Sequence, residues 1–161
     1  MTYLLSAQSD ADLPDMYPRY MAYLESVRDR FPSSALALAA SGWYFDFSDH
    51  RCPHDAWLES VAISELGTGR RGESRTLSMT VRLLGAYHDG YIEFHYPQVF
   101  SYRLNVPDGG NGHRDWRYDE FRLSENGRLL HEIEWYGSQP TGTWLIEASD
   151  VHFNWIPKAA A

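Results

Sequence analysis

The densest group of chemically reactive side chains lies in the segment Asp49-His50-Arg51-Cys52-Pro53-His54-Asp55. Imidazole, thiolate and carboxylate groups all ligate transition metals. Because His50, Cys52 and His54 alternate, an extended backbone would project their side chains to one side. The alternative is a purely structural role, as a polar loop in which Asp55 accepts hydrogen bonds from nearby backbone N–H groups. The chain has neither CxxC nor HExxH. We therefore predict no cofactor, and keep a transition metal such as zinc at these three residues as the alternative.

Histidine followed by aspartate recurs along the chain. His54-Asp55 and His88-Asp89 each precede a predicted strand, and His113-Arg114-Asp115 is a looser third copy. An aspartate that orients a histidine is common beside catalytic and metal-bound imidazoles. Adjacent side chains point in different directions, however, so the dipeptide is not itself a dyad. The favoured interpretation is exposed turns, which collect both residue types.

His131 is expected on an apolar strand face, because it shares parity with Ile133 and Trp135. There it could be a pocket base or pH-sensitive group, or a core histidine with a satisfied hydrogen bond. The many aromatic residues are core by default, although some could line a cavity. The pocket or interface candidates are Asp55, His88, Asp89, His131, Trp135 and Trp144.

The chain lacks the sequence signatures of several enzyme classes. The chain has no P-loop, no GxGxxG and no GxSxG elbow. Cys52 could act as a nucleophile only with a base such as His50 or His54, and no pattern of a thiol enzyme surrounds it. The catalytic residues are therefore unknown, and the sequence favours a protein that is not an enzyme.

The composition is that of one globular domain. Of 161 residues 43% are apolar, 22% are charged and 15% are aromatic. With 14 basic against 22 acidic residues and a net charge of -8, nucleic-acid binding is not expected, whereas a basic protein partner is compatible. The lone cysteine excludes an intramolecular disulfide. We find neither a signal peptide nor a membrane span, so we expect a cytoplasmic protein without membrane contact.

The predicted elements divide the chain into a helical segment at about 15–41 and a β meander at about 43–156. Apolar residues every three or four positions predict a helix with Asp15 as its N-cap, so that Pro18 falls in the first turn. A serine-capped short helix follows Pro32. Alternating apolar residues then predict strands at 43–47, 57–66, 74–85, 90–96, 98–106, 115–124, 128–137 and 143–155, the last broken at Ser149-Asp150.

These elements predict a single domain over residues 1–161, of the mainly β (α+β) class. Short strands joined by tight turns such as Asn126-Gly127 form an antiparallel meander. That many strands close into a barrel or split into a sandwich, and one or two N-terminal helices would cover it. An uncovered sheet edge could pair two copies into a homodimer.

Three stretches carry a resemblance: His54-Asp55-Ala56-Trp57-Leu58-Glu59, Leu83-Leu84-Gly85-Ala86-Tyr87-His88-Asp89-Gly90 and Trp144-Leu145-Ile146-Glu147. They resemble small uncharacterised bacterial β-rich proteins, loosely similar to immunity proteins of bacterial toxin systems. The resemblance implies no activity and supplies no catalytic residue. Two hypotheses remain: a non-enzymatic intracellular protein-binding domain, immunity-like, and a small-ligand or metal-binding β domain with a His/Cys/Asp site.

Overall fold

A computed structural model describes residues 1–106, 109–136 and 142–160 of the chain. Helical elements come first: η1 (Leu4–Ser6), η2 (Asp10–Asp12), α1 (Leu13–Val27), η3 (Arg28–Arg30) and α2 (Ser33–Ala39). The strands follow: β1 (Trp57–Leu66), β2 (Thr76–Leu84), β3 (Gly90–Tyr96), β4 (Val99–Leu104), β5 (Asp115–Leu123), β6 (Leu129–Tyr136), β7 (Gly142–Ala148) and β8 (His152–Pro157). Among the described residues, no helix is long and apolar enough to cross a membrane.

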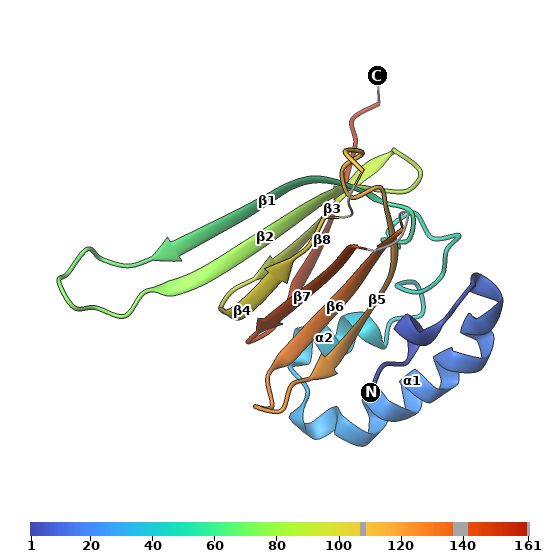
Figure 1. Ribbon diagram of the computed structural model, residues 1–161, viewed down its shortest axis with the longest axis horizontal. Helices are drawn as coiled ribbons and strands as arrows, with labels where there is room; N and C mark the ends of the chain where they lie inside the picture. Colours follow the sequence, from blue (N-terminus) through green and yellow to red (C-terminus); the bar gives the residue numbers. More distant parts are fainter. Residues whose placement is uncertain (107–108, 137–141, 161) are drawn as a thin grey trace.

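The strands form one antiparallel sheet in the order β4-β7-β6-β5-β1-β2-β3-β8. Its two halves, β8-β3-β2-β1 and β5-β6-β7-β4, meet at a single pair, Trp57 opposite Asp115. Beyond this pair β1 and β5 diverge, and the β1–β2 hairpin projects away from the body (Figure 1). The end strands β4 and β8 do not pair with each other in the described ranges. The predicted mainly β class is confirmed, and the sheet is sandwich-like rather than a closed barrel.

The two halves exchange strands. After β3 the chain crosses to the other half, where β4 pairs with β7. After β7 it crosses back, and β8 pairs with β3. The Ser149 N–H donates to the Gln98 carbonyl at 2.9 Å and so ties one crossover to the other. The β7–β8 crossover confirms the predicted break at Ser149-Asp150, and the exchange makes the two halves one unit.

The expected strand at 43–47 is wrong. This segment is a series of turns, in which Asp46 N–H donates to Trp43 O (3.1 Å) and Asp49 N–H to Asp46 O (2.9 Å). Tyr44 is nonetheless fully buried, and its ring meets Phe45 edge-on at 4.8 Å. The aromatic run that suggests a strand therefore serves tertiary packing.

The helix α1 covers the edge of β5 that β1 leaves open. The buried Tyr20 hydroxyl donates to Phe121 O and accepts from Phe121 N–H, both at 2.9 Å. The Tyr23 hydroxyl accepts from Leu123 N–H at 2.8 Å. Two tyrosines thus bond backbone groups that a neighbouring strand would otherwise pair. The helix begins at Leu13, two residues before the predicted N-cap, so Pro18 lies inside it.

The N-terminus of the helix α2 is capped by a side chain that is distant in sequence. Its expected serine cap is wrong, because Pro32 occupies the N-cap position. Instead the Asp150 carboxylate, from the turn between β7 and β8, accepts from Ala35 N–H (2.9 Å) and Ser34 N–H (3.2 Å). A carboxylate there satisfies free N–H groups and matches the positive end of the helix dipole.

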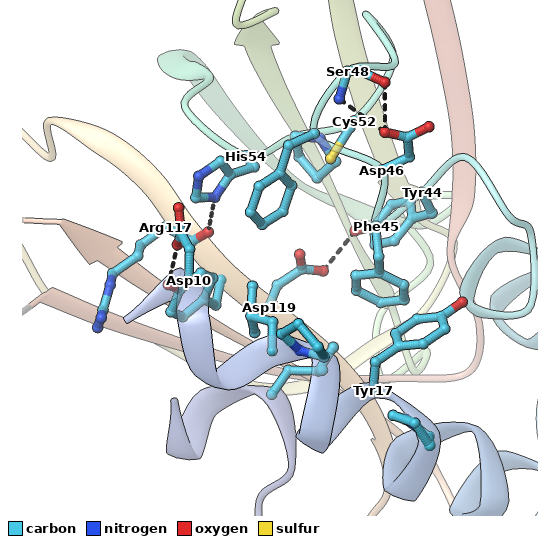
Figure 2. A pocket seen from close by; sticks show the side chains of 17 residues that line it. Asp10, Tyr17, Tyr44, Phe45, Asp46, Ser48, Cys52, His54, Arg117 and Asp119 are labelled. Atoms are coloured by element: carbon cyan, nitrogen blue, oxygen red, sulfur yellow. Dashed lines mark hydrogen bonds between the residues drawn. The ribbon is translucent and has the colours of Figure 1, made fainter. Parts of the chain in front are cut away.

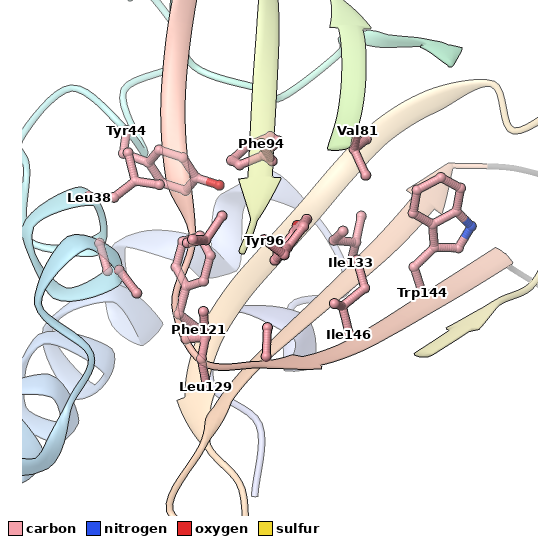
Figure 3. Packing of buried hydrophobic residues seen from close by; sticks show 14 of the residues in the cluster. Leu38, Tyr44, Val81, Phe94, Tyr96, Phe121, Leu129, Ile133, Trp144 and Ile146 are labelled. Atoms are coloured by element: carbon pink, nitrogen blue, oxygen red, sulfur yellow. The ribbon is translucent and has the colours of Figure 1, made fainter. Parts of the chain in front are cut away.

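Large aromatic and aliphatic side chains fill the core between the sheet halves and the helices (Figure 3). The largest fully buried ones include Trp116, Trp135, Trp144, Tyr44, Tyr96, Phe94 and Phe121. Phe94 stacks on Trp116 with ring centroids 5.4 Å apart, and Trp116 meets Trp135 edge-on at 5.4 Å. Much of the aromatic excess is therefore structural.

Candidate functional site

A cavity of about 450 Å³ lies between the N-terminal helical segment, the turns of residues 44–54 and the edge of β5. Its wall comes from the first two turns of α1, the turns of residues 44–54 and β5 residues 117–119 (Figure 2). The size suits a small-molecule site. Aromatic rings dominate its wall: Tyr17, Tyr44, Phe45, Phe47 and Tyr118.

Asp119 is the central polar group of this cavity, although only 4% of it is exposed. Its Oδ2 accepts from the Tyr44 hydroxyl at 2.6 Å and lies 2.8 Å from His131 Nε2. Its Oδ1 accepts from the Trp116 indole N–H at 3.1 Å. Since a carboxylate accepts, His131 donates through Nε2, and its Nδ1 then accepts from the Tyr96 hydroxyl at 2.7 Å.

His131 belongs to this buried network. The imidazole is fully buried, and both of its nitrogens have partners. Burial raises the pKa of Tyr96 well above its ordinary value, with the Asp119 charge as the smaller cause. Burial likewise raises the pKa of Tyr44, helped by its contacts with Asp119. The hydroxyls therefore stay protonated as donors, and His131 is a satisfied core histidine that orients Asp119.

Cys52 and His54 reach the cavity wall, whereas His50 does not. Burial raises the pKa of the Cys52 thiol to about 12, against a smaller lowering by the His54 backbone. The thiol is therefore neutral near pH 7 and a poor nucleophile or ligand. His54 Nδ1 donates to Arg117 O at 2.5 Å, and its ring stacks on Phe47 at 3.7 Å. His54 thus closes part of the free edge of β5.

The three proposed metal ligands do not converge. His50 lies elsewhere, with its Nδ1 2.5 Å from Asp89 Oδ2 and its ring stacked on Tyr87 at 3.9 Å. Within the described ranges, no three His, Cys, Asp or Glu side chains are arranged to hold a metal ion. The physical reason is local: Cys52 N–H donates to Asp49 O at 3.0 Å, so the segment turns and the alternation expected of an extended chain is lost.

The three His-Asp motifs form turns, each with one left-handed residue: Asp55 (φ 67°), His88 (φ 60°) and Arg114 (φ 61°). They meet around Trp57. The Trp57 indole N–H donates to Asp115 Oδ1 at 2.8 Å, and its ring lies 4.5 Å from that of His88. Asp89 contacts His50 rather than its neighbour His88, whereas in the first motif His54 Nε2 lies 3.6 Å from Asp55 Oδ1.

These turns build an exposed surface that we name the aromatic–acidic surface. It consists of Trp57, Tyr87, Tyr136, Asp55, Asp89 and Asp115. The three rings are 49%, 48% and 58% exposed. Asp115 pairs with Tyr136 on β6 and with Trp57 on β1, which makes the surface continuous across the sheet. Asp55, Asp115 and Tyr136 also line a shallow pocket that shares His54 and Tyr118 with the cavity.

Two further candidates, Trp135 and Trp144, lie in the core. They are 0% and 1% exposed, and their rings meet at 5.1 Å. Each also contacts the ring of His113 at 5.0 Å. Among the described residues neither indole N–H has an acceptor. They do not contribute to the aromatic–acidic surface.

The acidic face of β6 carries its own counter-charges. Arg122 pairs with both Glu120 and Glu132, and Arg117 pairs with Glu134. Burial raises the pKa of Glu120 despite the opposing effect of Arg122. These carboxylates are therefore already paired with arginine side chains.

The cavity's central residue, Asp119, escaped the sequence analysis. The ladder between β5 and β6 is irregular between Trp116 and Tyr118, so Trp116 and Asp119 reach the same network although they differ in parity. Only the shared parity of Asp119 and Phe121 in the sequence indicates that Asp119 points inward.

Comparison of the chain with protein-family models, curated proteins and solved structures finds no significant match.

Proposed function

We propose that the chain is a non-enzymatic, immunity-like protein-binding domain whose aromatic–acidic surface binds a basic protein. The observation that carries the proposal is the grouping of three half-exposed aromatic rings with carboxylates on one continuous surface. Tryptophan and tyrosine dominate the energetics of protein interfaces. Their faces attract arginine and lysine, and nearby carboxylates add complementary charge.

The rigidity of this surface supports the same function. Asp115 holds the Trp57 indole at 2.8 Å, and the His50–Asp89 contact is supported by the stacked Tyr87 ring. Side chains fixed before binding lose less conformational entropy when a partner arrives. The net charge of -8 would also speed encounter with a basic protein.

The test is affinity capture from lysate, followed by titration calorimetry with the purified captured protein. Trp57→Ala should weaken its binding about 30-fold, as expected for an interface hot spot worth about 2 kcal/mol. Asp115→Asn should weaken it less, because the residue keeps its shape. Tyr102→Ala is the matched control, since Tyr102 is 42% exposed on the end strand β4, which carries no residue of the aromatic–acidic surface.

Support requires one basic protein that binds 1:1 and whose binding Trp57→Ala, but not Tyr102→Ala, impairs. An immunity role further requires that this protein arrest cell growth unless the chain is co-expressed. The proposal would be refuted if both variants bound the captured protein with equal affinity. It would also be refuted if the chain stayed monomeric in lysate and no other protein were captured with it.

The cavity favours a second candidate function, binding of a small organic cation with an apolar body. Three carboxylates line it, Asp10, Asp46 and Asp119, against one guanidinium, that of Arg117. Arg117 is already committed to Glu134. Aromatic walls with surplus negative charge complement an ammonium group on a hydrophobic body.

A probe pair tests this candidate directly. Phenylethylammonium should raise the melting temperature, whereas the neutral 2-phenylethanol should raise it much less. Asp46→Asn should weaken ammonium binding, since Asp46 is exposed and bonded only to Ser48 in its own turn. Asp49→Asn, outside the cavity wall, is the control. Equal shifts with both probes, or an unchanged Asp46→Asn response, would exclude the candidate.

A further inference from the structure

The strand β1 has a bare edge. On one side it pairs with β2 along its length, and on the other it meets β5 only at Trp57. Within the described ranges no other residue pairs with the edge from Leu58 to Leu66, and most of the strand is exposed. Figure 1 shows the β1–β2 hairpin standing clear of the body. Unpaired N–H and C=O groups along such an edge are a template for another strand.

Apart from an irregularity between Leu58 and Ser60, this edge lacks the usual protection against pairing. Its sequence Trp57-Leu-Glu-Ser-Val-Ala-Ile-Ser-Glu-Leu66 contains no proline and no lysine. Its charges are neutralised within the hairpin, because Glu59 pairs with Arg82 and Glu65 with Arg75, both at 3.1 Å. The contrast with β5 is informative, since side chains of α1 bond the backbone groups on the edge of that strand.

We propose that this edge pairs antiparallel with β1 of a second copy, about a two-fold axis at Ala62. In this register Val61 lies opposite Ile63 of the partner subunit and Ser60 lies opposite Ser64 of the partner subunit, because the irregularity of β1 between Leu58 and Ser60 ends its regular stretch at Ser60. The apolar side chains of Val61 and Ile63 then meet on one face of the joined sheet, the face on which they lie opposite Val81 and Met79 of β2. An axis at Ile63 instead would put Val61 opposite a glutamate. Cross-strand matching therefore selects the axis at Ala62.

Charge complementarity also identifies the occupant as a second copy. The hairpin tip carries Arg70 and Arg71 with one carboxylate, Glu73, which accepts from Thr68 and Gly69 N–H, whereas acidic Asp55 and Asp115 flank the base of β1. With the axis at Ala62, the hairpin tip of one copy extends toward the residues that precede β1 in the other. An antiparallel pair therefore places each basic tip on the other copy's acidic base. Such a self-complementary contact is the isologous interface of a C2 dimer.

A single cysteine on the axis tests the register. Opposed residues of an antiparallel pair have Cα atoms about 4.5–5.5 Å apart, which a disulfide can span. Ala62→Cys should therefore form a disulfide-linked dimer under mild oxidation. Native Cys52 is buried and does not compete. Ser64→Cys is the register control, because it would lie opposite Ser60 of the partner subunit. Ser101→Cys, exposed on the edge strand β4, controls for random collision.

Light scattering of the unmodified chain completes the test, with Ile63→Lys as the disrupting variant. Ile63 is 42% exposed, so its replacement should leave the fold intact, as far-UV circular dichroism will report. The expected result is a concentration-dependent dimer that Ile63→Lys reduces at least tenfold in association constant. Cross-linking of Ala62→Cys no faster than of Ser101→Cys, or a monomer at every concentration, would overturn the proposal. Faster cross-linking of Ser64→Cys would overturn its register.

Discussion

The tyrosine contacts that close the edge of β5 predict a specific loss of stability in Tyr20→Phe. The native hydroxyl serves two backbone groups of Phe121 at 2.9 Å each, at a residue with 0% exposure. Burial raises the pKa of this hydroxyl well above its ordinary value, so it remains a donor. The substitution removes one oxygen and leaves a buried N–H and a buried C=O without partners.

The expected cost follows from these two orphaned groups. Each unsatisfied buried group costs about 1–3 kcal/mol, and relief from burying the hydroxyl itself offsets part of the sum. We expect Tyr20→Phe to lower the free energy of unfolding by about 2–4 kcal/mol. Tyr23→Phe should lower it by only about 1 kcal/mol, since its half-buried hydroxyl accepts a single bond from Leu123.

Urea unfolding followed by tryptophan fluorescence measures both effects. The dependence on urea should keep the same slope, because the area exposed on unfolding is unchanged. Tyr17→Phe is the control, since the Tyr17 ring lines the cavity and covers no backbone group of β5 in the described residues. If Tyr20→Phe cost less than about 0.5 kcal/mol, or no more than Tyr23→Phe, this reasoning would be refuted.

Two further predictions concern titration. The pKa of the Cys52 thiol is about 12. At pH 8 the thiol should therefore react with iodoacetamide about 1,000-fold more slowly in the native protein than in denaturant. Mass spectrometry measures the labelling, and fast labelling of the native protein would contradict this prediction. Burial lowers the pKa of His113 below 6.5, so its contribution to stability is complete above the unfolded pKa and is lost as the pH falls through the lower folded pKa. Urea unfolding at pH 7 and pH 5 should therefore show a smaller loss for His113→Gln than for the wild type, and equal losses would exclude this origin.

Local pattern predicted the elements well, for a physical reason. Alternation along β2, β3 and β6 reflects one buried face, and the bonds that create it lie within each hairpin. The strand exchange by β4 and β8 depends on pairing between distant segments, which leaves no periodic trace in the sequence. The cavity also arises from long-range arrangement, because α1, the turns of residues 44–54 and β5 enclose it.

For the candidate site residues too, local pattern predicts the strand face but not the partners that come from distant segments. His131 was expected on the apolar face and lies there, but its partners Tyr96 and Asp119 come from other strands. The His50, Cys52 and His54 alternation assumed an extended backbone, whereas turns separate the side chains. The aromatic–acidic surface joins loops distant in sequence, so only folding brings Trp57 beside Asp115 and His88.

The basic tip of the β1–β2 hairpin has a consequence for regulation by concentration. In the proposed dimer, the hairpin tip of one copy, which carries Arg70 and Arg71, extends toward the surface of the other copy that is proposed to receive a basic protein. The tip then acts as a built-in competitor that occupies the site until a tighter ligand displaces it. Dimerisation and partner binding would draw on the same pool of free chains, so the apparent affinity for the partner would fall as the chain accumulates.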